Sequence, residues 1–534
     1  MRTKMVLVVL FFVVGCQAQN LDGERRLDFP AGQVVGILPV GDSAIGVANL
    51  NQEESLPLGP AGLFTVAEGY VVLDNVNRSI HFLQDDFTIS RSIDVSAYAV
   101  GLTVAVQSGE NLVLLDVASH QPALVVLCSD GTHSRMVIET DEDSPPSGLS
   151  IDDLGLIVEY AGGERLYRVV DNGEVVEFVP AEGYMWNGKL YSIDPPLEMF
   201  DRERTIRIGE RTATIATPNM LGSARLLGVN AQGDAFVIVE DVSFTPEVVV
   251  EQTIWRIDAE ANIIDVSRVP LEEREVGNSF GVAISHDGNP IAMIPRVDRI
   301  EFWSLSPVEP EFVLGRVSSE PSVSETPILD EGDDRSTVGR ATSALYVAGS
   351  GCLTASQMQS NINEYGRVSI WLTSTNISGS CSGRVAPLYL RGAGWYSSVS
   401  YDWGGFDTPS EFISAMRSGG KAGNRSDARG LSCSYGVDCS GFVSRVWGTR
   451  RLTTRDIPGA SYAVSFYQFG DVLNYPGLHV VIFAALGADG IFTYESTIAN
   501  NYDRVVFMYR TWSSLSGYSR RRSFTACSPP ITST

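Results

Sequence analysis

The sequence has few positive charges for its length. Lys and Arg number 39 against 64 Asp and Glu in 534 residues, which gives a formal net charge of −25. A chain of this charge is repelled by nucleic acid and by anionic membrane surfaces, although a local basic cleft is not excluded. Histidine is scarce as well, with five residues. Chemistry that needs an imidazole therefore has few candidates.

Long apolar runs are confined to the N-terminus. Two basic residues precede an unbroken apolar run at 5–14, and no later segment is long and apolar enough for a transmembrane helix. This pattern predicts a signal peptide over 1–18. Val-Val-Gly-Cys at 13–16 resembles a bacterial lipobox, which would place a lipid anchor on Cys16; secretion with cleavage after Ala18 is the alternative. We expect an exported protein of the cell envelope, which contacts the membrane only through such an anchor.

Cysteine is sparse too, at seven residues, and its use suits an oxidising compartment. Four residues are disulfide candidates: Cys352, Cys381, Cys433 and Cys527. The simplest pairing joins Cys352 to Cys381 and Cys433 to Cys527, and four cysteines allow three connectivities. Cys439 is then left as an odd thiol near the C-terminus. An unpaired cysteine in an exported domain requires an explanation.

Residues 25–308 have the pattern of short β-strands separated by turns. The segment 64–74 predicts a strand, a tight turn and a second strand, and turn sequences at 230–234 and 285–289 each precede a β-run. Units of roughly 40–50 residues predict a radial repeat. The rhythm resembles a β-propeller of the NHL or WD40-like sort with six or seven blades; an array of β-sandwiches is the alternative. The region indicates an architecture and leaves its ligand unknown.

Residues 309–340 are rich in Pro, Ser, Glu and Asp and predict a linker. A second domain is expected over 341–534, with its core at about residues 390–525. The chain is therefore expected to be multidomain, with its chemistry in the C-terminal part.

A cysteine lies at the predicted start of a helix in this C-terminal part. The segment 436–448 changes from turn residues to helical spacing at Cys439, and Asp438 is a good N-cap. The helix dipole and the free N–H groups of the first turn favour a thiolate and can bind an oxyanion. This position predicts a nucleophile.

The C-terminal part contains one histidine. His479 opens a predicted buried strand, and it is the one imidazole that its own domain can offer Cys439 as a base. The return strand at 491–496 would bring Glu495 alongside, where a carboxylate can orient the ring. Asn500 or a backbone carbonyl is the alternative third group.

Three motifs, in this order, resemble the NlpC/P60 family of cell-wall peptidases. They are Tyr-Asp-Trp-Gly-Gly at 401–405, Asp-Cys-Ser-Gly-Phe-Val at 438–443 and His-Val-Val-Ile-Phe at 479–483. The resemblance implies an α+β papain-like C-terminal domain with Cys439 as nucleophile and His479 as base. It implies a peptidoglycan endopeptidase that cleaves γ-D-glutamyl to diamino-acid bonds of stem peptides through a thioester, with no metal or organic cofactor.

The resemblance also assigns roles to residues around the nucleophile. It implies that Tyr401 lies beside the sulfur of Cys439 and helps to bind the oxyanion or the substrate. Asp438 and Ser440, together with Tyr401, would line a pocket for the free amine of a stem peptide. Trp403 belongs to the same substrate-binding group, or else closes a tight turn.

The sequence departs from the family between two of these motifs. Residues 406–435 intervene where the family usually proceeds directly to the nucleophile, and we expect them to form a lobe over the cleft that changes substrate choice, with a helix at 410–417. Glu495 also replaces the family's usual His, Asn or Gln. Two alternatives stay open: an amidase or acyltransferase acting on another amide, or a propeller binding protein with an inactive hydrolase domain.

Overall fold

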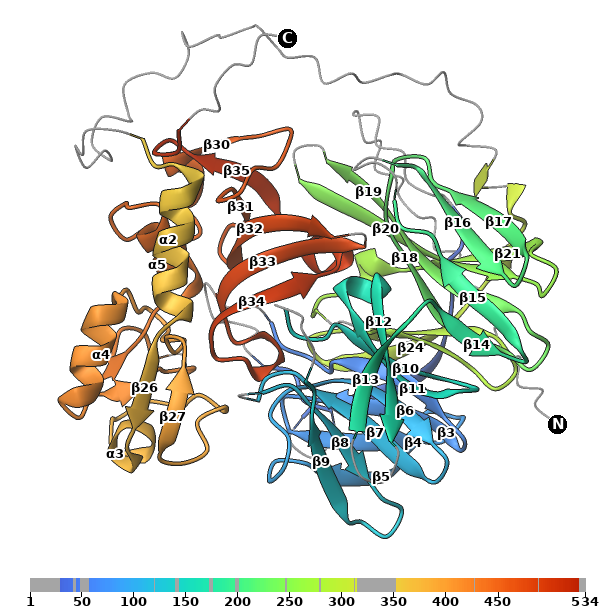
Figure 1. Cartoon of the computed structure of the whole chain (residues 1–534), viewed down its shortest axis with the longest axis horizontal. Helices are drawn as coiled ribbons and strands as arrows, with labels where there is room; N and C mark the ends of the chain where they lie inside the picture. The colour runs from blue at the N-terminus through green and yellow to red at the C-terminus, as the bar shows by residue number, and fades with distance from the viewer. Residues whose placement is uncertain are drawn as a thin grey trace, which may run out of the picture.

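The computed structural model describes residues 29–41, 45–48, 57–119, 121–139, 144–171, 176–196, 201–244, 247–277, 280–311, 313–314, 352–426, 428–487 and 489–527. The expected signal peptide with Cys16 and residues 315–340 of the predicted linker lie outside the described residues. Two units are visible in Figure 1, an N-terminal one drawn from blue to yellow-green and a C-terminal one drawn from yellow to red. Among the described residues, no helix is long and apolar enough to cross a membrane.

The described part of the N-terminal unit forms six antiparallel sheets, which we call blades one to six. Blades one to three consist of β2 (Gly62–Val66), β3 (Gly69–Asp74), β4 (Ser79–Leu83) and β5 (Ile89–Asp94); β6 (Leu102–Ser108), β7 (Asn111–Asp116), β8 (Ala123–Leu127) and β9 (His133–Val137); and β10 (Gly148–Asp152), β11 (Gly155–Tyr160), β12 (Arg165–Asp171) and β13 (Val176–Ala181). Blades four to six consist of β14 (Tyr184–Trp186), β15 (Lys189–Ile193), β16 (Glu203–Ile208) and β17 (Arg211–Ala216); β18 (Met220–Val229), β19 (Ala235–Phe244), β20 (Val248–Ile257), β21 (Ile263–Val269) and β25 (Pro307–Val308); and β22 (Val282–Ile284), β23 (Pro290–Pro295), β24 (Arg299–Leu305) and β1 (Gly32–Pro39).

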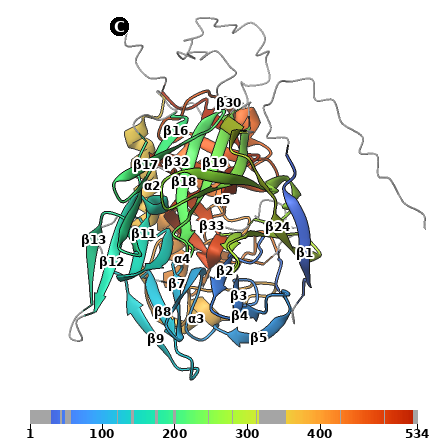
Figure 2. The same cartoon turned by 90° about the vertical axis from the view of Figure 1, so that its right-hand side faces the viewer.

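The blades close into a ring through their inner strands. β2 contacts β6, β6 contacts β10, β10 contacts β14, and β18 contacts β22, which returns to β2; β18 meets the fourth blade through β15 and β16. The first strand of the unit, β1, completes the sixth blade by pairing with β24 (Figure 2), so the two ends of the unit share one sheet. The predicted propeller is therefore confirmed, with six of the six or seven expected blades. An array of β-sandwiches does not describe this ring.

The described part of the C-terminal unit combines four α-helices with a six-stranded antiparallel sheet. The helices are α2 (Ala355–Gly366), α3 (Ser374–Ser378), α4 (Pro409–Arg417) and α5 (Cys439–Val446), and the sheet has the order β30 (Ser461–Ala463), β35 (Ser519–Ser523), β31 (Val472–Tyr475), β32 (His479–Gly487), β33 (Gly490–Thr497) and β34 (Arg504–Arg510). Two short strand pairs are separate from it: β26 (Ser369–Leu372) with β27 (Gly394–Ser397), and β28 (Lys421–Ala422) with β29 (Ser434–Tyr435).

The sheet is the middle layer of the molecule, with α2 and α5 on one side and the propeller on the other (Figure 1). Alternate residues of a strand point to opposite faces. In β32, Val480 and Ile482 pack in the cluster that contains the apolar face of α5. Val481 and Phe483 pack instead with Val242 and other residues of the fifth blade. Both faces of β32 are covered, which explains why its sequence is a continuous apolar run.

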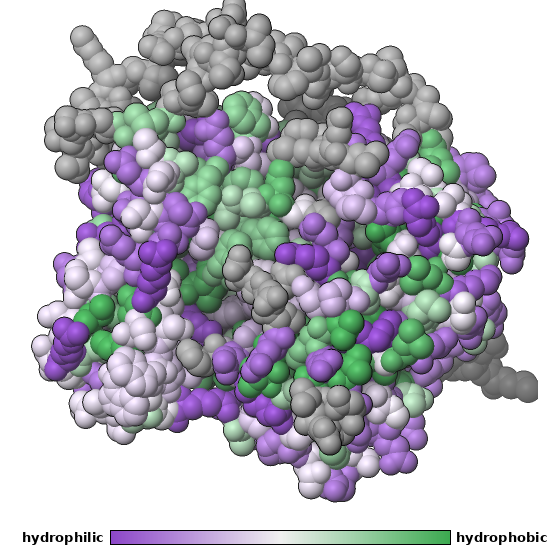
Figure 3. Space-filling model, in the orientation of Figure 1, coloured by the Kyte–Doolittle hydropathy of each residue, from purple (hydrophilic) through white to green (hydrophobic). Residues whose placement is uncertain are grey.

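Polar bonds join the two units around this apolar contact. Glu240 of the fifth blade accepts the backbone N–H groups of Trp512 and Ser513, at 3.0 and 3.2 Å. Asp489, at the tip of the β32–β33 hairpin, accepts the N–H of Ala224 at 2.9 Å. In the space-filling view, hydrophobic side chains gather over β32–β34 beside the propeller (Figure 3). The two units therefore share an interface that combines apolar packing with hydrogen bonds.

The disulfides join Cys352 to Cys527 and Cys381 to Cys433. The pairing predicted as simplest is therefore wrong, although the same four cysteines are involved. Leu353 forms a parallel bridge with Ala526, so the two ends of the C-terminal unit lie side by side, and Cys527 meets Cys352 rather than Cys433. Pairing by sequence proximity fails because the unit closes on itself.

Candidate active site

Cys439 is the first residue of α5, as predicted. Asp438 is the N-cap in extended conformation, and its Oδ1 accepts the N–H of Gly441 at 2.6 Å. The side chain of Cys439 is completely buried. The cap satisfies the N–H of Gly441, the third helical residue, and so stabilises a helix that begins at Cys439.

Tyr401 is held beside the nucleophile segment by backbone pairing. It forms a parallel bridge with Val437, two residues before Cys439, and the N–H of Asp402 donates to the carbonyl of Val437 at 3.3 Å. The ring of Tyr401 is 2% exposed. The backbone of Tyr401 therefore lies next to the residue that precedes the nucleophile motif, and the contact between Tyr401 and the sulfur of Cys439 stays a prediction.

His479 and Glu495 form the second half of the candidate site. His479 opens β32, and Glu495 lies on the adjacent strand β33, where its Oε2 is 3.1 Å from Nε2 of His479. Both side chains are buried, with exposures of 3% and 0%. The contact predicted from the hairpin is therefore present. Asn500, the alternative third group, lies in the 3₁₀ turn after β33, and the hydrogen-bond partner of Nε2 is Glu495.

The guanidinium group of Arg510 lies next to Glu495. His479, Glu495 and Arg510 together form a row of buried side chains, which we call the candidate catalytic row. Arg510, at the end of β34, donates from Nε to Oε1 of Glu495 at 2.8 Å and from a terminal nitrogen to Oε2 at 2.6 Å. The hydroxyl of Thr493 adds a bond to Oε1 at 2.6 Å. Arg510 was not predicted from the sequence; the available signal was an arginine at the end of the apolar strand that follows the strand of Glu495.

The charges of this row fix the state of the imidazole. Burial acts to raise the pKa of Glu495, but the charge and hydrogen bonds of Arg510 and the bond from His479 hold it well below its ordinary value. Burial lowers the pKa of His479, while Glu495 acts in the opposite direction. An ionised Glu495 can only accept, so Nε2 of His479 carries the proton and Nδ1 keeps a lone pair. That is the tautomer of a general base.

Asp438 and Ser440 do not form the open amine pocket that the resemblance implied. Oδ2 of Asp438 accepts the N–H of Gly404 at 3.0 Å and a guanidinium N–H of Arg451 at 2.5 Å. Oδ1 accepts both Gly441 and the hydroxyl of Ser440. The carboxylate is saturated by donors of its own chain, so the structure gives it a capping and positioning role. That expectation is corrected accordingly.

The inserted segment 406–435 folds over the Tyr401–Gly405 motif. It contains α4, close to the helix predicted at 410–417, and is tied down by the Cys381–Cys433 disulfide. Gly430 donates its N–H to the carbonyl of Trp403 at 3.0 Å. Trp403 is therefore packed under the insertion, which agrees with its turn-closing interpretation.

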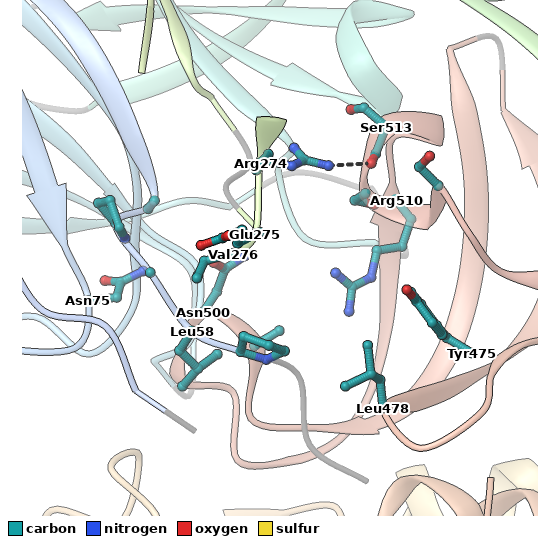
Figure 4. A pocket seen from close by; sticks show the side chains of 18 of the residues that line it. Leu58, Asn75, Arg274, Glu275, Val276, Tyr475, Leu478, Asn500, Arg510 and Ser513 are labelled. Atoms are coloured by element: carbon teal, nitrogen blue, oxygen red, sulfur yellow. Dashed lines mark hydrogen bonds between the residues drawn. The ribbon is translucent and has the colours of Figure 1, made fainter. Parts of the chain in front are cut away.

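A cleft of about 280 Å³ lies between the propeller and the C-terminal unit (Figure 4). Its walls include Arg510 and Leu478, the residue before His479, as well as Tyr518. A second cavity of about 900 Å³ occupies the centre of the propeller. Within the described residues, no group of three or more His, Cys, Asp or Glu side chains is placed to hold a metal ion.

The fold and the site define a six-bladed propeller joined to a mixed α and β unit with a buried Cys, His and Glu. No family model and no curated protein matches the chain. Among solved structures it is similar to a streptogramin B lyase (12% identity, 49% of this chain and 97% of that one, TM-score 0.31). It is also similar to a member of the duf4221 family from Bacteroides vulgatus (9% identity, 53% and 100%, TM-score 0.32). Scores of this size carry no argument about activity.

Proposed function

We propose that the C-terminal unit is a papain-like cysteine hydrolase of the NlpC/P60 type, with Cys439 as nucleophile and His479 as base. One observation carries this proposal: a thiol at a helix N-terminus belongs to the same unit as an imidazole backed by a buried carboxylate. α5 packs directly against β32 and β33, the strands that hold His479 and Glu495.

In the proposed reaction, Nδ1 of His479 takes the proton of the Cys439 thiol. The thiolate attacks an amide carbonyl and forms a tetrahedral oxyanion, which the N–H of Cys439 and the hydroxyl of Tyr401 would stabilise. The imidazolium then protonates the leaving amine, and the C–N bond breaks to leave a thioester. Water, deprotonated by His479, hydrolyses the thioester and regenerates the thiol.

The proposed substrate is a peptidoglycan stem peptide, cut at a γ-D-glutamyl to diamino-acid bond, because the three motifs resemble a family of cell-wall peptidases. Export to the cell envelope is part of the proposal and is supported by the two disulfides, since such bonds persist in oxidising compartments. The saturated carboxylate of Asp438 favours a second candidate, an amidase or acyltransferase acting on another amide, because it removes the expected anchor for a free amine.

The test is mass spectrometry of muropeptides incubated with the purified chain and with a Cys439→Ala variant. Cys128→Ala is the matched control, since Cys128 is the other free cysteine of the described residues and lies in the second blade. New fragments that require Cys439 but not Cys128 support the proposal, and their masses identify the bond. An unchanged mixture with the unmodified chain would refute the cell-wall substrate.

A further inference from the structure

The loop at residues 498–503 joins β33, the strand of Glu495, to β34 and lies against the propeller. Its backbone is unusual, because Asn500, Asn501 and Asp503 have positive φ angles of 49°, 60° and 52°. Asn and Asp tolerate this left-handed conformation better than most residues with a side chain, but it is unfavourable for them as well. Such a conformation persists where surrounding contacts fix it. The surroundings of the loop must therefore hold it in place.

Asn501 ties the loop to the first two blades. Its side chain is buried, and its Nδ2 donates to the backbone carbonyls of Asn75 at 3.1 Å and of Val100 at 2.9 Å. Asn75 lies in the turn between β3 and β4, and Val100 lies two residues before β6. Gly101 lies directly against the loop, since a Cβ atom added to it would overlap the carbonyl oxygen of Asn500. The loop is therefore fitted to the surface of the propeller.

Arg504, the first residue of β34, strengthens this attachment. Its guanidinium donates to the carbonyls of Ala118 and Ser119, which follow β7, at 3.2 and 3.1 Å. The acceptors that the propeller offers to Asn501 and Arg504 are all backbone carbonyls. Because the blades fix these carbonyls, the propeller gives the loop rigid points of attachment.

The same segment contacts the candidate site. The carbonyl of Asp503 accepts the N–H of Tyr401 at 2.8 Å. Just before the loop, the hydroxyl of Ser496 donates to the carbonyl of Val437 at 2.6 Å, and Val437 lies two residues before Cys439. The loop and its flanks are therefore bonded to the tyrosine motif and to the segment that leads to the nucleophile.

The side-chain amide of Asn501 connects these two sets of contacts. Its Oδ1 accepts a guanidinium N–H of Arg425 at 3.2 Å, and the same guanidinium donates to Oδ2 of Asp503 at 3.2 Å. Arg425 belongs to the inserted segment 406–435. One amide group therefore accepts from the C-terminal unit and donates to the propeller.

We propose that Asn501 is a positioning residue of the candidate hydrolase. It holds the loop at 498–503 in its left-handed conformation against the propeller and thereby fixes where Tyr401 and Glu495 lie. The propeller then acts on the reaction through this loop. This inference rests on the proposed function, because the site that the loop positions is that of Cys439.

The first test uses the full-length chain with Asn501→Asp, which keeps the acceptor for Arg425 but replaces the donor of both propeller bonds by an oxygen. Hydrogen exchange, measured by mass spectrometry, should become at least about tenfold faster in peptides that cover 398–404 and 496–505. Alkylation of Cys439 by iodoacetamide near pH 6 should slow about tenfold or more, since small displacements of reacting groups reduce rates strongly. The midpoint of its pH profile should rise, because a displaced imidazolium stabilises the thiolate less.

Gly101→Ala perturbs the same contact from the propeller and leaves every residue of the C-terminal unit in place. It should speed exchange of the same two peptides and slow the alkylation. Gly277→Ala is its matched control, because a Cβ atom added there meets nothing within 4 Å among the described residues. Asn262→Asp is the control for Asn501→Asp, since it makes the same chemical change in an exposed turn of the fifth blade. Both controls should behave as the unmodified chain does.

Faster exchange of both peptides together with slower alkylation would support the inference. Unchanged exchange, faster exchange with an unchanged alkylation rate, or the same effects in the two controls would overturn it. If alkylation of the unmodified chain does not depend on His479, the proposed reaction is refuted. The exchange of the peptide at 398–404 then decides by itself whether Asn501 positions the segment of Tyr401.

Discussion

The buried Glu495–Arg510 pair gives the most direct quantitative test of the candidate site. Its two hydrogen bonds use both carboxylate oxygens, and the side chains are 0% and 11% exposed. Glu495→Gln would leave the guanidinium in this site without its counter-charge. Removing one partner of a buried pair costs about 3–5 kcal/mol, so we expect the free energy of unfolding to fall by that amount.

The double variant Glu495→Gln/Arg510→Met measures the interaction energy between the two side chains separately from their other contacts. This variant removes the buried charge together with its partner. Its free energy of unfolding should therefore fall by less than the two single variants' losses added together, with a coupling energy of about 2–3 kcal/mol. Urea denaturation monitored by tryptophan fluorescence measures all four proteins. Additive single effects within about 0.5 kcal/mol would refute the argument that the pair acts as a unit.

The same variants report on the imidazole. If Glu495 fixes the tautomer of His479 and stabilises its cation, alkylation of Cys439 by iodoacetamide near pH 6 should slow about ten- to a hundredfold in Glu495→Gln, because the imidazole loses the carboxylate that orients it and balances its positive charge. His479→Gln should slow it at least as much. An unchanged rate in both variants would mean that Cys439 is not paired with the imidazole.

Two further predictions concern stability. Cys381→Ser removes the disulfide between Cys381 and Cys433, which are 52 residues apart in sequence. It should lower the free energy of unfolding by about 3–4 kcal/mol, which thermal unfolding under oxidising conditions measures. Burial raises the pKa of Asp489 from 3.8 to about 7, so its contribution to stability is present below about pH 4 and is lost as the pH rises through 7. Asp489→Asn should remove this loss and stabilise the chain at pH 8 by about 2–4 kcal/mol, whereas a denaturation midpoint with the same pH dependence as the unmodified chain would contradict the assignment.

Local features of the site could be predicted from the sequence because each depends on neighbouring residues. The start of α5 follows from one capping aspartate and the helical spacing after it. The contact between His479 and Glu495 follows from a short turn that forces two strands to pair. The repeated turns of the sequence were enough to predict a propeller. They could not predict that β1 completes the last blade, because its partner β24 is more than 250 residues away.

Other features could not be predicted because several distant segments determine them together. Arg510 reaches Glu495 only through the register of β33 and β34, and a shift of one residue would point it to the opposite face. The second donor on Asp438, Arg451, comes from a loop with no motif of its own. The disulfide pairing depends on the bridge between the ends of the unit.

The composition of the sequence predicts a boundary between the propeller and the C-terminal unit. In the structure the two units nevertheless pack against each other. The C-terminal sheet presents Leu473, Val481 and Phe483 to the propeller, and the apolar cluster that covers them includes Val242 and Val250 of the fifth blade. Without the propeller, this face would be an exposed apolar patch beside the candidate catalytic row. A propeller used only as a tether would not need to cover that face. The shared apolar core therefore means that the two units are to be tested as one molecule.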